Sequence, residues 1–202
     1  MAQLLWFLTR ASGVVAMILI VAAVADGLVF SGREGGRRLR PAWWMDLHRG
    51  LGGYALMFTG LHLVTAYGAG IGVTVATVFV PNASSVSTTA YTLGVVALYA
   101  MAITVFTSWP KRRLPRRFWH VVHLLSIPAA VAAAVHGWQL GTDATTPWYM
   151  ALMVGLTALV TYPLALRLSG IARRRRDGTE PPTAPTTDPS TPAPRVLVDA
   201  RH

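Results

Sequence analysis

The sequence predicts an all-α membrane protein, a polytopic bundle of about five transmembrane helices. Hydrophobic residues make up 53% of its 202 residues and charged residues 13%, whereas a soluble domain carries about 25% charged residues. The mean hydropathy is +0.45. The net charge of +10 comes from short basic clusters between apolar runs. Such clusters are typical of membrane topology signals, so we expect contact with lipid and no binding of nucleic acid.

The helices follow from five apolar segments of spanning length. About 20 residues, rising 1.5 Å each, cross the hydrocarbon core, and only a helix pairs its own peptide groups there. Tryptophan or tyrosine lies near many of the segment ends, as in interfacial belts. The segments are residues 11–31, 43–67, 90–109, 119–140 and 148–168.

The charges between these segments predict the orientation. Residues 32–41 carry four arginines and one glutamate, residues 110–118 carry five basic residues, and residues 172–178 carry four arginines. The stretch 68–89 has no charge. The excess of basic residues on cytoplasmic loops therefore places the N-terminus outside and the C-terminus in the cytoplasm of a multi-pass protein of the cell membrane.

We expect two regions, a transmembrane domain over residues 1–172 and a cytoplasmic tail over residues 173–202. The tail begins with arginines and continues as TEPPTAPTTDPSTPAPR, a composition rich in proline and threonine. Such a composition buries too little apolar surface to build a core. We therefore expect the tail to be disordered.

Five of the six histidines lie in two of the predicted helices. His48 and His62 are in the second helix, and His120, His123 and His136 are in the fourth. Ionisable groups inside a membrane are costly and usually functional. Both helices run outward, so His48 is level with His123 near the cytoplasm, and His62 lies about 21 Å further along its helix. Facing imidazoles suit the axial positions of haem iron, so we expect an inner pair, His48–His123, and an outer pair, His62–His136.

The angles favour this arrangement on one helix only. His48 and His62 are roughly 40° apart around an ideal helix, whereas His123 and His136 are roughly 140° apart and His120 and His136 roughly 160°. Pro128 lies between the latter histidines and could kink the helix. The awkward angle supports an alternative with a single haem. At the membrane interface beside Trp119, His120 is interpreted as a hydrogen-bonding residue.

Several other residues are candidates for contact with the cofactor. Arg10 near the outer surface and Arg49 after the inner histidine could pair with haem propionates, although both could instead contact lipid headgroups. Small residues beside the histidines would leave room for a macrocycle or simply let helices pack closely. These are Gly50, Gly52, Gly53 and Gly60 on one helix and Ala132, Ala133, Ala134 and Gly137 on the other. Asp26 is expected to pair with one of the inner arginines.

The spacing resembles a known family. H-x13-H on one helix and H-x12-H on another are similar to the ferric-reductase-like transmembrane domain, which includes NADPH oxidases, ferric reductases and the haem-binding membrane subunit of a bacterial methionine sulfoxide reductase. The stretches LHRGLGGYALMFTGLHLVTAY and RRFWHVVHLLSIPAAVAAAVHGW resemble small bacterial members, over roughly residues 4–168. The resemblance implies two b-type haems on His48, His62, His123 and His136, and Trp119 four residues before His123 favours His123 over His120.

The family implies electron transfer from the cytoplasm outward. Only 34 residues follow Leu168, and no glycine-rich phosphate-binding motif occurs. We therefore expect no FAD or NAD site here, and an electron-transfer component that receives electrons from a cytoplasmic flavoprotein reductase or a quinol. The acceptor would be a ferric chelate, oxygen or a redox protein on the outer side. The alternatives are a single-haem subunit of a larger oxidoreductase and a haem-free metal permease or scaffold.

Overall fold

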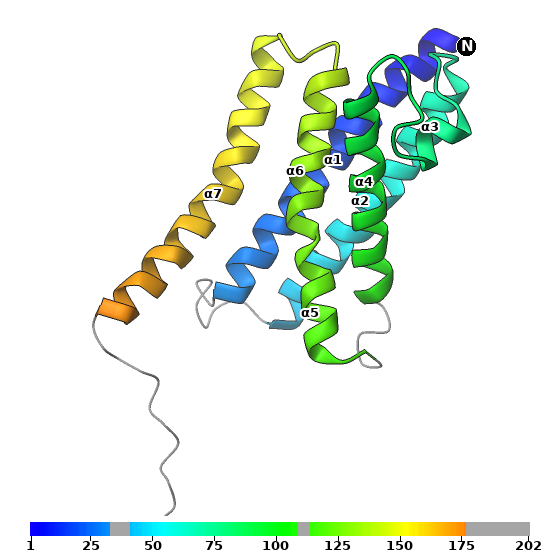
Figure 1. Cartoon of the computed structure of the whole chain (residues 1–202). Helices are drawn as coiled ribbons and strands as arrows, with labels where there is room; N and C mark the ends of the chain where they lie inside the picture. The colour runs from blue at the N-terminus through cyan, green and yellow to red at the C-terminus, as the bar shows by residue number, and fades with distance from the viewer. Residues whose placement is uncertain (33–40, 109–113, 177–202) are drawn as a thin grey trace, which may run out of the picture. The chain divides into compact units, whose positions relative to one another are not determined.

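The computed structural model describes residues 1–32, 41–108 and 114–176 (Figure 1). The described residues form seven helices and no strand. The helices are α1 Ala2–Gly32, α2 Pro41–Gly68, α3 Val75–Phe79, α4 Thr88–Ser108, α5 Arg116–Leu124, α6 Ser126–Leu140 and α7 Pro147–Arg176. The all-helical membrane bundle predicted from the sequence is thereby confirmed.

Four stretches of helix are long and apolar enough to cross a membrane. They are Ala2–Val29, Thr88–Ser108, Arg116–Leu140 and Pro147–Ala172. The predicted span 43–67 corresponds to α2, whose 28 residues reach far enough but include the charged Asp46 and Arg49 and two histidines. Two statements stay predictions: that α2 is a fifth span, and that the N-terminus lies outside and the C-terminus in the cytoplasm.

The helices suit lipid on their outer surfaces and use small residues where they meet. Large apolar side chains such as Val64, Val131 and Val154 are at least 60% exposed. Thr9 and Thr65 donate their hydroxyls to carbonyls four residues earlier, each at 2.8 Å, so these polar groups need no water. The most buried apolar residues include several alanines, which let helix backbones approach closely. Among them are Ala55, Ala90 and Ala129, each at most 3% exposed.

The closest helix packing joins α1 to α2 and α4 to α6. Contacts between α1 and α6 and, less extensively, between α2 and α4 link these two hairpins, and α5 packs against α4. In Figure 1, α3 and α5 lie at opposite ends of α4. A small apolar core of Met17, Val21, Tyr149 and Leu156 packs α7 against α1. Among the described helices, α2 and α6, which carry His62 and His136, are not one of the closely packed pairs.

The chain divides into two compact units, Met1–Ala165 and Leu166–His202. The first unit contains all the histidines predicted to bind haem. The second begins within α7, which continues to Arg176. Most of the tail predicted over residues 173–202 lies outside the described residues, so its disorder stays a prediction.

Candidate functional site

The structure brings the four predicted histidines together in two pairs. His48 of α2 and His123 of α5 have ring centroids 5.8 Å apart, with an angle of 56° between the rings. His62 of α2 and His136 of α6 have centroids 6.3 Å apart and nearly perpendicular rings, at 87°. The pairing matches the one expected from the sequence.

A break between α5 and α6 explains how His123 and His136 reach the same partner helix. The helix is interrupted at Leu125, whose φ of −61° and ψ of −17° end α5 with a hydrogen bond from its N–H to the Val122 carbonyl at 3.1 Å. Pro128 has no N–H to donate to the Leu124 carbonyl, so the α-helical hydrogen bonds are interrupted at this turn. The roughly 140° that separates the two histidines on an ideal helix therefore does not apply.

Backbone carbonyls hold the rings of the His62–His136 pair. His62 Nδ1 lies 2.8 Å from the Thr9 carbonyl oxygen of α1, and His136 Nδ1 lies 2.8 Å from the Ala90 carbonyl oxygen of α4. A carbonyl can only accept, so Nδ1 carries the proton in both rings. The lone pair of each neutral imidazole is then on Nε2.

Glycines give these two rings access to the carbonyls. In a helix the side chain of residue i+4 lies over the carbonyl of residue i. Gly13 lies four residues after Thr9, and a Cβ there would be 2.9 Å from His62 Nδ1. Gly94 lies four residues after Ala90, and a Cβ there would be 2.7 Å from both Nδ1 and Cε1 of His136. Only glycine therefore leaves the rings where they are.

Side chains hold the rings of the His48–His123 pair. His48 Nδ1 lies 3.2 Å from Oδ2 of Asp26, whose side chain is 6% exposed. His123 Nδ1 lies 3.3 Å from the Ser108 hydroxyl, which donates its own proton to the Thr104 carbonyl at 2.7 Å and so accepts from His123. Trp119 stacks on His123 at 4.7 Å between centroids and 21° between planes.

Comparison with known proteins identifies the family. Residues 12–134, more than half of the chain, match the ferric reductase like transmembrane component. The chain belongs to this family. The match includes His48, His62 and His123 and ends two residues before His136. Searches of curated proteins and of solved structures gave no significant match.

Ferric reductase-like membrane domains generally bind haem and work with redox partners and lipid. Two imidazoles that bind one metal ion through nitrogens about 2 Å away place their ring centroids roughly 6 Å apart. Both pairs have this separation, and all four rings have an anchor on Nδ1, as metal-bound histidines usually do. The residues therefore fit haem.

A bare metal ion fits less well than haem. Among the described residues, no group of three or more histidines, cysteines, aspartates or glutamates could hold a metal ion. Protein sites for a bare ion usually supply at least three ligands, whereas haem iron needs at most two axial ligands from the chain. Two isolated pairs match the second requirement.

The other predicted residues lie around these pairs. Arg10 forms an ion pair with Asp143 and stacks over the Trp6 ring at 4.3 Å. Arg49 is exposed, with Nη1 3.9 Å from Asp46 Oδ1. His120 is exposed on α5 beside Trp119, at 6.4 Å between ring centroids. Their predicted roles toward a haem propionate or the membrane interface stay predictions.

Sequence reasoning missed the residues that hold the rings. It interpreted glycines on the histidines' own helix as room for a macrocycle, and this interpretation stays a prediction, since a Cβ at Gly50, Gly53 or Gly60 would meet nothing within 4 Å. The glycines that contact the rings are Gly13, Gly27 and Gly94 on the neighbouring helices. A glycine four residues after a helical carbonyl is a signal that could have been used, although it says nothing about which ring approaches.

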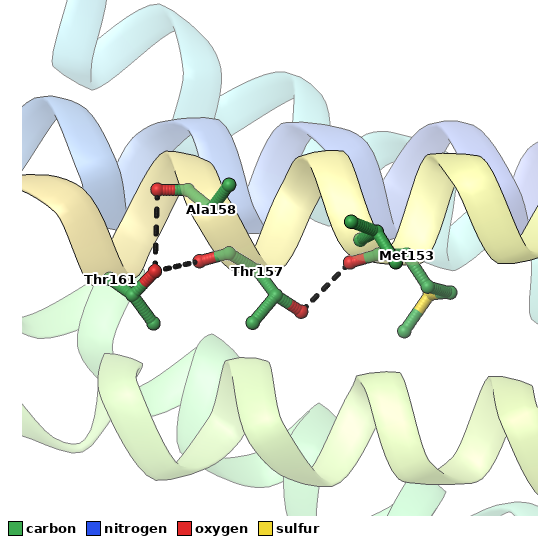
Figure 2. Close-up of a pocket in the computed structure, with 5 residues that line it drawn as sticks. Met153, Thr157, Ala158 and Thr161 are labelled. Atoms are coloured by element: carbon green, nitrogen blue, oxygen red, sulfur yellow. Dashed lines mark hydrogen bonds between the residues drawn. The ribbon is translucent and has the colours of Figure 1, made fainter.

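A shallow groove on α7 does not belong to this site. Met153, Val154, Thr157, Ala158 and Thr161 line it. Figure 2 shows that its hydroxyls bond within the helix, Thr157 to the Met153 carbonyl at 2.8 Å and Thr161 to the Thr157 carbonyl at 2.9 Å. The groove therefore presents methyl groups and no polar side-chain group in need of a partner, which is how a lipid-facing surface looks.

Proposed function

We propose that this membrane component is a di-haem cytochrome of b type, with one haem on His48 and His123 and one on His62 and His136. When bound, each haem would supply an iron that takes up and releases one electron. The observation that carries the proposal is the pairing of four histidines whose Nδ1 atoms are all hydrogen-bonded to groups outside the pair. That pattern directs Nε2 toward a metal.

The separation of the pairs supports transfer across the membrane. His48 and His62 are fourteen residues apart on α2, which is about 21 Å along the helix axis, against a hydrocarbon core of about 30 Å. Each pair therefore lies toward one end of the span. The basic segments favour the cytoplasmic side for the His48–His123 pair, so we propose that electrons enter there and leave at the His62–His136 pair.

The donor and the acceptor are parts of the same proposal. We propose that a cytoplasmic flavoprotein reductase or a quinol delivers electrons. Both histidines of each pair would be used in holding the haem, so the chain would offer no further place on the iron for a substrate. The acceptor, a ferric chelate, oxygen or a redox protein, would then take electrons without binding iron. The chain would act as the electron-transfer component of an oxidoreductase, and Arg10 and Arg49 are proposed to contact haem propionates.

Reconstituted vesicles test this function. Purified chain, expressed with haem supplied, is inserted into vesicles that contain trapped ferricyanide, and dithionite is added outside. We expect loss of ferricyanide absorbance to be faster than in vesicles without protein. The variant His62→Ala should fall to the protein-free rate, and the matched variant His120→Ala should keep the wild-type rate. Equal rates for wild type and protein-free vesicles would contradict the proposal.

A further inference from the structure

The two helix hairpins hold their histidines in an equivalent way, with one difference. In each hairpin, α1–α2 and α4–α5–α6, a carbonyl of the first helix holds the ring of the His62–His136 pair. A side chain near the other end of that first helix holds the ring of the His48–His123 pair. In α4 this side chain is the neutral hydroxyl of Ser108, whereas in α1 it is the carboxyl of Asp26.

Asp26 is placed to act on His48. Its side chain is buried, and Oδ2 lies 3.2 Å from His48 Nδ1. Its main-chain carbonyl accepts a hydrogen bond from Trp44 Nε1 at 3.4 Å. The next residue, Gly27, gives the ring room, since a Cβ there would be 3.3 Å from His48 Cε1.

A carboxylate that accepts a hydrogen bond from Nδ1–H makes the imidazole a more basic ligand. Ferric iron carries one more positive charge than ferrous iron, so a more basic ligand and a nearby negative charge stabilise the oxidised form. The low dielectric of a membrane interior preserves this effect. The carbonyls behind His62 and His136 carry no net charge, so they stabilise the oxidised form less.

We infer that Asp26 is a positioning residue that lowers the reduction potential of the haem on His48 and His123 below that of the haem on His62 and His136. This inference rests on the proposed function. It gives that function a direction, because transfer of one electron from the first haem to the second then runs downhill. Asp26 would set this direction without touching haem, through His48 alone.

Potentiometric titration of the purified full-length protein tests the inference. Wild type should show two one-electron components. Asp26→Asn keeps the size and a hydrogen-bond acceptor but removes the charge. It should raise the reduction potential of the lower-potential haem by at least about 59 mV, which is a tenfold change in the ratio of ferrous to ferric haem at a given potential. The potential of the other haem should stay unchanged.

The control variant is Asp46→Asn, which removes the same charge two residues before His48. Its side chain is 74% exposed, so water screens its charge. We therefore expect less than a threefold change in the ratio of ferrous to ferric haem of the lower-potential component. If Asp26→Asn loses a haem, Ser108→Asp decides instead, because it places a carboxylate beside His123. In Ser108→Asp, a tenfold fall in the ratio of ferrous to ferric haem of the lower-potential component would support the inference. An unchanged ratio for that component would overturn it.

The two claims fail separately. Wild-type protein without two haems would overturn the proposed function. Two haems in Asp26→Asn that titrate as in wild type, or an equal shift in Asp46→Asn, would overturn only the role of Asp26.

Discussion

Replacing Gly94 with alanine should selectively weaken the site formed by His62 and His136. The new Cβ would lie 2.7 Å from Cε1 and Nδ1 of His136 and 3.3 Å from Cγ, whereas carbon atoms pack best at about 3.5–4.0 Å. The ring must therefore move by roughly 1 Å. Its 2.8 Å hydrogen bond to the Ala90 carbonyl then stretches beyond a useful length.

The magnitude follows from two opposing effects. Overpacking costs about 1–3 kcal/mol, and the better helix propensity of alanine returns up to about 1 kcal/mol, so the protein should still fold. Loss of the group that orients a metal ligand typically weakens metal binding about 10–100-fold. The haem on this pair should therefore be lost first.

The assay is the haem-to-protein ratio of purified protein after dilution and gel filtration. We expect two haems in wild type and close to one in Gly94→Ala. Gly155→Ala on α7 is the control, because a Cβ there would meet nothing within 4 Å, and it should retain two. Two haems with a wild-type spectrum in Gly94→Ala would refute the role given to the Ala90 carbonyl and Gly94.

Four further changes test the ligands and the tail. His62→Ala should remove one haem and His48→Ala the other, each leaving about half of the absorbance, and an unchanged spectrum in either would rule out that ligand. His120→Ala should keep both haems, because His120 is exposed and lies outside both pairs; loss of one would show that the ligand choice on α5 is wrong. Deleting residues 177–202 should leave the haem spectrum intact, and a lost flavin signal would instead reveal a cofactor in the tail.

Apolar length was enough to predict the bundle, and the pairing of its histidines was predicted from their spacing together with the resemblance to a family. His48 and His62 share a face of α2 because fourteen residues nearly complete four turns. The path of the fourth predicted helix was beyond such reasoning. Pro128 marks a possible kink, but its angle depends on how the freed backbone repacks, and the break falls at Leu125.

The groups that form hydrogen bonds with Nδ1 of the histidines were harder to predict for a different reason. Every residue has a carbonyl, so the sequence does not single out Thr9 or Ala90 as acceptors. Asp26 was expected to pair with an arginine, because charge alone suggests an ion pair, and the described structure places it against His48. Contacts of this kind depend on which helices become neighbours.

The most direct test of the account is a reduced-minus-oxidised spectrum of the purified protein together with its haem-to-protein ratio. The account predicts two low-spin b-type haems per chain. One haem per chain would leave one histidine pair without a cofactor and contradict the two-site relay. No haem, in protein prepared with haem supplied, would contradict the account as a whole and favour a metal permease or a scaffold.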